Sequence, residues 1–155
     1  MVLTWEDCRA VFQPDGALRD IYVQGTTEDD WDAILAFVDA QGFSAAYTRN
    51  GIAGPLPRDV AKVFADRQAS HLLRFDIGGG VHIHGYFFEP YEIEMDIDPK
   101  EIRSEKELEP LVRFLRGIGD LLSKDVLLTE ESAIEHIYLT YFSQTKSFSL
   151  TPAHQ

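Results

Sequence analysis

The sequence predicts one α+β domain, with an antiparallel or mixed sheet of six to seven strands and three to four helices packed on one face. Segments with the apolar spacing of helices alternate with segments in which polar and apolar residues alternate singly. Turn-forming Gly, Pro and Asn residues separate these segments. With 155 residues, 45% of them hydrophobic, the chain has enough apolar material for one core. We therefore expect a single globular domain over residues 1–142 and a polar C-terminal tail over residues 143–155.

Four segments have the apolar spacing of amphipathic helices. They follow Thr4, Thr27, Pro57 and Ser104, which are residue types typical of helix N-termini. In the last of these segments, Pro110 lacks an N–H donor and crowds the preceding turn. The sequence therefore predicts either a separate turn before Pro110 or a bend in the helix.

Seven segments have the pattern of β-strands. Four of them lie outside the centre of the chain, over residues 18–24, 43–49, 126–128 and 137–142. The other three lie between residues 71 and 98 and follow one another with only short turns between them. Consecutive strands joined by short turns pair antiparallel, whereas the helices between the earlier strands leave parallel pairing open.

Hydrophobic alternation selects one register for the three central strands. If Gly78–Gly80 and Glu89–Tyr91 are the turns, Phe75 lies opposite Ile83 and every residue on their face is apolar or glycine. A slip of one residue in either hairpin would place Asp or His side chains on that face. The glycine-rich turn joins two strands, so it differs from the strand-to-helix loops that bind phosphates.

The same register places a group of ionisable side chains on the opposite face. Its three rows are Asp76, His82 and Asp98; Arg74, His84 and Asp96; and Leu72, Tyr86 and Glu94. Cross-strand neighbours lie about 5 Å apart at Cβ, so each His side chain has a carboxylate within reach. A neighbouring carboxylate favours the charged imidazolium, and we therefore expect raised pKa values for both histidines.

The pair His82 and His84 supports two chemical interpretations. Both imidazoles point to one side of a strand, and with Asp96 or Asp98 they could ligate Zn²⁺ in a metal-binding enzyme or sensor. The other interpretation is a solvated face on which His and Arg side chains balance acidic ones. No third His or Cys follows at the spacing of metal ligands, and no sequence motif identifies a catalytic nucleophile. We therefore assign no catalytic residue, and whether the chain is an enzyme stays open.

The remaining candidates for chemistry have structural explanations. Cys8 lies on the apolar side of its predicted helix, and a lone Cys excludes an internal disulfide. His71 falls on the apolar side of its strand, His136 begins a strand and His154 lies in the tail. The sequence contains no phosphate-binding, serine-hydrolase, metalloprotease or paired-cysteine motif.

Acidic residues dominate the charge of the chain and are concentrated in two segments. The formal net charge is −12, from 26 Asp and Glu against 14 Lys and Arg, and residues 26–40 and 89–109 hold −11 of it. Such a surface suits neither nucleic acid nor an anionic membrane, but it complements a basic protein partner. The residues that we expect to form the interaction surface are Asp76, His82, His84, Glu92, Glu94, Asp96 and Asp98.

In size and charge the chain resembles the small acidic immunity proteins that neutralise bacterial toxins. That resemblance implies a non-enzymatic module that masks a basic protein surface without a cofactor. The sequence shows neither a signal peptide nor an apolar run of membrane length, and a single Cys suits a reducing compartment. The expected location is therefore the cytoplasm.

Overall fold

The computed structural model describes residues 2–152, which form one antiparallel sheet with helices packed against it. Its helices are α1 (Trp5–Cys8), α2 (Glu28–Ala40), α3 (Val60–Ala65), α4 (Glu105–Leu122) and the 3-10 helix η1 (Pro99–Glu101). Its strands are β1 (Arg19–Gln24), β2 (Ser44–Arg49), β3 (Ile52–Gly54), β4 (His71–Asp76), β5 (His82–Glu89), β6 (Glu92–Ile97), β7 (Val126–Glu130), β8 (Ala133–Phe142) and β9 (Ser147–Leu150). The predicted α+β class is confirmed.

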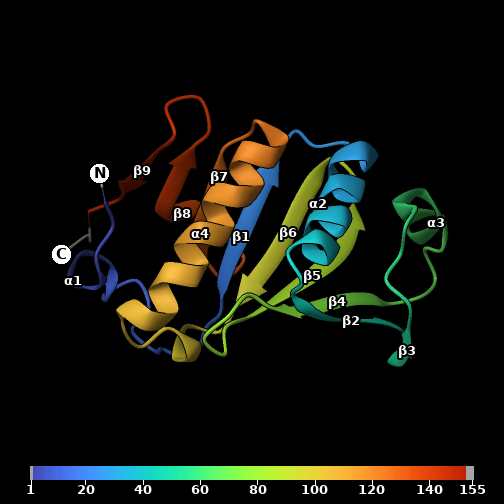
Figure 1. Ribbon diagram of the computed structural model, residues 1–155, viewed down its shortest axis with the longest axis horizontal. Coiled ribbons are helices and arrows are strands. Elements are labelled where there is room, and N and C mark those ends of the chain that lie inside the picture. The colour runs from blue at the N-terminus through green and yellow to red at the C-terminus, as the bar shows by residue number, and fades with distance from the viewer. Residues whose placement is uncertain (1, 153–155) are drawn as a thin grey trace.

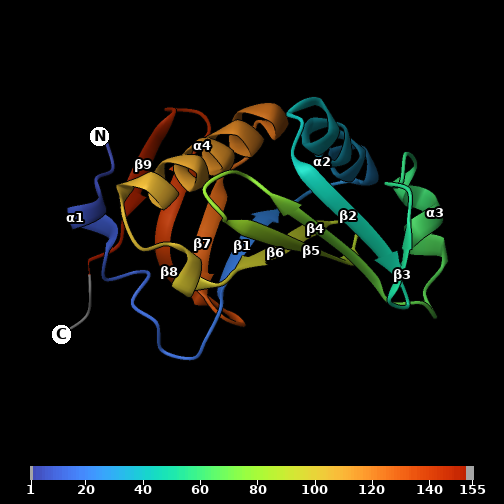
Figure 2. The same cartoon turned by 60° about the horizontal axis from the view of Figure 1, so that its bottom comes forward.

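Nine strands form the sheet, in the order β3-β2-β4-β5-β6-β1-β7-β8-β9, and every neighbouring pair is antiparallel. The two long helices of the described chain, α2 and α4, lie side by side across the same face of the sheet (Figures 1 and 2). The described part of the chain therefore places no helical layer over the opposite face. Within residues 2–152, no helix is both long and apolar enough to cross a membrane.

The sheet has more strands than the six to seven that the sequence predicts, and the two unforeseen ones are β3 and β9. β3 contains only three residues, all exposed, so it has no hydrophobic alternation that could reveal it. β9 lies within the segment expected to be a polar tail, residues 143–155. There, Phe148 is buried against Tyr141 while its neighbours are polar. A strand with a single buried anchor gives too weak a pattern to be recognised.

The helices α1, α2 and α4 begin at the predicted capping residues, whereas α3 begins after Asp59, two residues beyond the predicted Pro57. Thr27 accepts a hydrogen bond from the Asp30 N–H, and the Asp30 side chain accepts one from the Thr27 N–H, so α2 begins with a capping box. Ser104 caps α4, which continues through Pro110 as one helix. A separate turn before Pro110 is therefore excluded.

The glycine-rich turn between β4 and β5 is a strand-to-strand turn, as predicted. Gly78, Gly79 and Gly80 all have positive φ, and the Ile77 N–H donates to the carbonyl of Val81 across the turn. The turn lies against α4, since a Cβ added at Gly78 or Gly79 would lie 3.8 Å from the proline ring in that helix.

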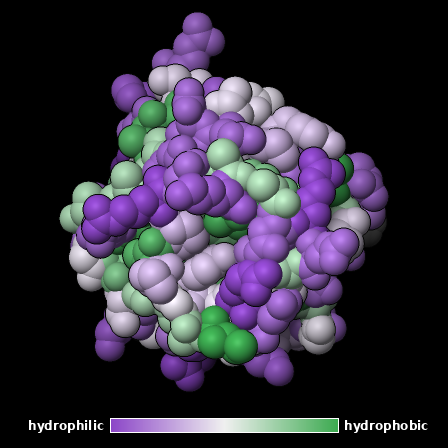
Figure 3. All heavy atoms as spheres, turned by 90° about the vertical axis from the view of Figure 1, so that its right-hand side faces the viewer, coloured by the Kyte–Doolittle hydropathy of each residue, from purple (hydrophilic) through white to green (hydrophobic). Residues whose placement is uncertain are grey.

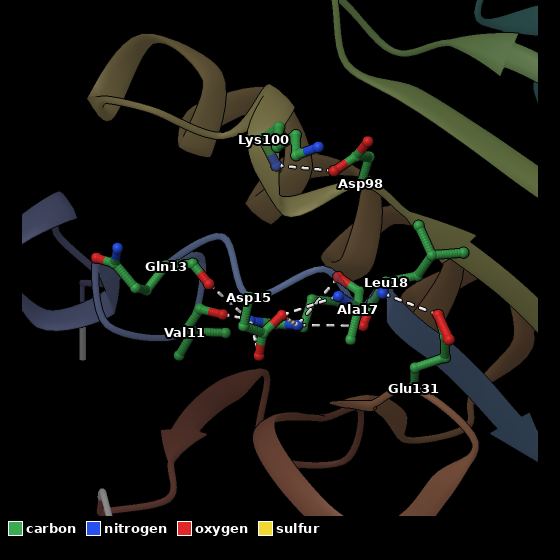
Figure 4. Close-up of polar contacts among 9 residues, drawn as sticks. Val11, Gln13, Asp15, Ala17, Leu18, Asp98, Lys100 and Glu131 are labelled. Carbon is green, nitrogen blue, oxygen red and sulfur yellow. Dashed lines mark hydrogen bonds and ion pairs between the residues drawn. The ribbon is translucent and has the colours of Figure 1, made fainter.

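A buried arginine fixes the segment that leads from α1 into the sheet. The Arg19 side chain, only 2% exposed, donates to the carbonyls of Val11 and Gln13 and forms an ion pair with Asp15. Figure 4 shows this segment, in which the Leu18 N–H also donates to Glu131. One guanidinium therefore satisfies several polar groups of a segment that has no regular structure.

The end of the molecule that carries β3 and α3 presents no continuous apolar surface. Figure 3 views this end and shows apolar groups separated by hydrophilic ones. Ile52 of β3 is 74% exposed. Single exposed apolar residues are common on protein surfaces, so we place no binding site here.

Gly119 on α4 is predicted not to tolerate a side chain. A Cβ there would lie 2.5 Å from the ring of Tyr141, which is buried and held by a hydrogen bond to Asp120. We expect Gly119→Ala to lower the free energy of unfolding by about 1–3 kcal/mol, because overpacking outweighs the gain in helix propensity. Urea denaturation measures the change.

Gly117→Ala is the matched control for this substitution. A Cβ at Gly117 would meet only the outer end of the half-buried Phe37 ring, at 3.0 Å, and that ring has room to move. This variant should be neutral or slightly stabilised. Equal urea midpoints for Gly119→Ala and the wild type would show that the close packing against Tyr141 is unimportant.

Candidate functional site

Apart from Asp98, the predicted ionisable side chains lie on the sheet face that α2 and α4 leave uncovered. We call this surface the open face. The register confirms the expected cross-strand pairs Asp76–His82, Arg74–His84, Leu72–Tyr86, His84–Asp96 and Tyr86–Glu94. Its fourth strand is β1, which places Asp20 opposite Asp96 and Tyr22 opposite Glu94. The open face therefore extends over β4, β5, β6 and β1.

Three carboxylates, from Asp20, Glu94 and Asp96, lie together where β6 pairs with β1 on the open face, and we call them the acidic cluster. Asp20 and Asp96 lie directly opposite each other and are only 4% and 6% exposed. The Tyr22 hydroxyl lies 3.1 Å from Asp20 and 3.2 Å from Glu94, so two carboxylates share one donor. The backbone N–H of Ser132 donates to Asp20 at 2.7 Å.

Asp20 and Asp96 of the acidic cluster are buried, Glu94 is half-buried, and no cation of the described residues compensates them. Burial raises the pKa of Asp96 to about 6, and it also raises the pKa values of Asp20 and Glu94. Repulsion among the carboxylates adds to the effect at Glu94 and Asp96. Within residues 2–152, no Lys or Arg forms an ion pair with any of the three. Like charges opposite each other on neighbouring strands destabilise a sheet.

Aromatic side chains border the acidic cluster. Burial, together with the nearby carboxylates, raises the pKa values of Tyr22 and Tyr86 far above the usual range, so both hydroxyls stay protonated as donors. Phe88 is 68% exposed and stacks on Tyr86 with ring centroids 5.4 Å apart. The open face therefore combines carboxylates with an exposed aromatic surface.

His84 does not have the raised pKa that the sequence predicts. Burial and the neighbouring Arg74 charge lower its pKa, although its Nδ1 lies 3.6 Å from a carboxylate oxygen of Asp96. The prediction was wrong because it considered the carboxylate and omitted the loss of water around the imidazole. A neutral His84 leaves the charge of the acidic cluster uncompensated near pH 7.

His82 keeps the expected neighbour Asp76 and has Glu101 as a second partner in place of the expected Asp98. Its Nδ1 lies 2.9 Å from Glu101 of η1, which also accepts a hydrogen bond from the His82 backbone N–H, and its Nε2 lies 3.7 Å from Asp76. Asp98, expected beside His82, instead caps η1 by accepting a hydrogen bond from the Lys100 N–H. Sequence reasoning missed Glu101 because it did not foresee η1.

Asp20 is the member of the acidic cluster that sequence reasoning missed. Alternation along β1 places Asp20 and Tyr22 on one face, but no local pattern reveals that β1 pairs with β6. Glu92, also predicted for the interaction surface, lies half-buried at the start of β6 opposite Gln24. It therefore borders the open face and lies outside the acidic cluster.

The other histidines and the cysteine have structural surroundings. Cys8 is buried, as predicted, and burial raises the pKa of its thiol to about 11. Both ring nitrogens of His71 have hydrogen-bond partners, and His136 forms an ion pair with a carboxylate of β7. His154 lies outside the described residues.

The zinc site at His82, His84 and Asp96 stays a prediction. Among residues 2–152, no group of three or more His, Cys, Asp or Glu side chains is arranged to hold a metal ion. If the three residues bound zinc, the melting temperature would rise with the excess of zinc over its dissociation constant. Thermal unfolding with and without Zn²⁺ measures this.

Comparison with known proteins adds no assignment. No known protein family, curated protein or solved structure matches the chain. A functional proposal therefore depends on the chemistry of the open face.

The acidic cluster is predicted to destabilise the folded protein at neutral pH. The pKa of Asp96 is higher in the folded chain, so the folded state binds this proton more tightly, and the penalty fades as pH falls through about 6 toward 3.8. That difference in pKa corresponds to about 3 kcal/mol. We expect Asp96→Asn to raise the free energy of unfolding by about 1–3 kcal/mol at pH 8 and by much less at pH 4.

Denaturation curves at pH 8, 6 and 4 compare this variant with the wild type. Glu109→Gln is the control, because it removes an exposed carboxylate from α4 on the other side of the sheet. It should not stabilise the protein at pH 8. An Asp96→Asn protein that is less stable than the wild type at pH 8 would rule out the destabilising role.

Proposed function

We propose that this chain is a non-enzymatic interaction module whose open face binds basic side chains of a protein partner. The acidic cluster is the observation that carries this proposal. Three carboxylates lie together on an uncovered sheet face, two of them are buried, and no Lys or Arg of residues 2–152 neutralises them. Such an arrangement opposes folding, and sites that trade stability for function have this character.

A cation from a partner would remove the repulsion within the acidic cluster. Charge-assisted hydrogen bonds to carboxylates are stronger than neutral ones, and a guanidinium can engage two oxygens at once. Tyr86 and Phe88 offer an apolar surface beside the carboxylates, and aromatic residues are enriched at the centres of protein interfaces. The net charge of −12 would also speed encounter with a basic partner.

In a narrower form of this proposal, the protein partner is a toxin with a basic surface. Support for it comes from the size and acidity of the chain, in which it is similar to immunity proteins. The identity of a captured partner tests the narrower form, and so does the presence of a toxin reading frame beside the gene of this chain.

Affinity capture from the native host tests the open face with variants that keep the fold. Glu94→Gln/Asp96→Asn removes two charges from the acidic cluster, and we expect it to be at least as stable as the wild type. It should therefore lose the partner without unfolding. Phe88→Ser should weaken capture about tenfold, the size of effect typical of an exposed aromatic anchor at an interface.

Asp39→Asn/Glu109→Gln is the matched control, because it removes two exposed carboxylates from α2 and α4 on the opposite side of the sheet. This control should capture the partner as the wild type does. Raising the salt concentration from 0.05 to 0.5 M should weaken wild-type capture, since screening reduces attraction between exposed charges. Undiminished capture by the Glu94→Gln/Asp96→Asn protein would exclude the open face as the binding surface.

A further inference from the structure

A cavity of about 780 Å³ lies between the segment that follows α1 and the strands β8 and β9. Its walls include the apolar side chains of Val11, Ile137, Tyr138 and Leu150. Cavities of this size with mostly apolar walls and a few polar groups are typical of small-molecule sites. None of its lining residues belongs to the open face, so what it binds is independent of the function proposed above.

Acidic side chains supply the charge of this cavity, and no Lys or Arg of the described residues lines it. Asp7 accepts hydrogen bonds from Thr4 in the capping box of α1, and Glu130 lies 2.7 Å from Nδ1 of His136. The Glu130 hydrogen bond raises the pKa of His136, which opposes its deprotonation. Glu135 is exposed and forms no ion pair with another described residue. Its carboxylate is free to meet a ligand.

The guanidinium that packs against the Tyr138 wall of the cavity does not neutralise it. Arg19 lies against Tyr138, with its Cζ 5.3 Å from the ring centroid. That guanidinium is buried and already engaged by Asp15 and by backbone carbonyls. The carboxylates at the cavity therefore keep an excess of negative charge.

We propose that this cavity binds an organic amine, a small molecule with an apolar body and a protonated amino group. The apolar walls between β8, β9 and the α1 segment take the body of the ligand. The ammonium group lies toward Glu135, where it stays partly in water and pairs with the free carboxylate. An anionic ligand with the same body is repelled by Asp7, Glu130 and Glu135.

Three indole compounds that differ only in their polar group test this assignment. Tryptamine carries an ammonium, indole-3-ethanol a hydroxyl and indole-3-propionate a carboxylate. In two-dimensional NMR titrations of the full chain, tryptamine should shift the amides of Ala10, Val11, Ile137 and Leu150. It should bind at least fivefold more tightly than the alcohol, and the carboxylate should not saturate the site. Equal binding of all three compounds, or shifts confined to another region, would overturn the proposal.

Two variants and a control locate the amine within the cavity. Glu135→Gln should weaken tryptamine binding about twofold to fivefold, the upper part of the range for an exposed ion pair. Ala10→Phe places a ring in the cavity from an exposed position and should abolish binding, with a melting curve to confirm that it folds. Glu109→Gln, remote on α4, should leave binding unchanged. Unaltered affinity in Glu135→Gln would overturn the role of that carboxylate, even if Ala10→Phe does not fold.

Discussion

The pairing of β1 with β6 is the constraint on which the rest of the structure depends. β1 lies between β6 and β7, so it joins the five strands from the middle of the chain to the three from its C-terminal part. Ile21 and Val23 of β1 are fully buried in the core. Because side chains alternate along a strand, Asp20 and Tyr22 must then lie on the open face. The register that builds the core therefore also builds the acidic cluster.

Burial of the hydrophobic core stabilises the fold by more than the acidic cluster destabilises it. Leu108, Leu111, Leu115 and Ile118 of α4 are all buried, and each such side chain contributes about 1.5–3 kcal/mol of burial. One or two of them offset the penalty of about 3 kcal/mol that follows from the raised pKa of Asp96. The same penalty is nevertheless a large part of a net stability of about 5–15 kcal/mol. Selection for stability alone would favour an uncharged residue at Asp96.

Local patterns predict most elements of this fold, though not β3, β9 or η1, and the pairings of the three central strands, and they predict little beyond that. The alternation from residue 71 to 98 identifies both the apolar face and the row that contains His84 and Asp96. The pairing of β1 with β6 joins segments that are distant in the sequence, so local patterns do not place Asp20 beside Asp96. The pKa of His84 depends on burial by the whole fold, and Glu101 reaches His82 only through η1. Each of these features depends on contacts between parts of the chain that a local sequence pattern does not relate to one another.

The burial and the charge of the acidic cluster destabilise the free protein, and the same two features would stabilise a complex with a cationic partner. Asp20, Glu94 and Asp96 have already lost much of their hydration on folding, so a cation that reaches them meets carboxylates with less water to displace. Tyr22 hydrogen-bonds Asp20 and Glu94, which limits the freedom that these side chains would otherwise lose on binding. A bound cation would also lower the pKa of Asp96 and favour its charged form. The charges of the same three carboxylates therefore destabilise the free folded protein and would stabilise its complex with a cationic partner.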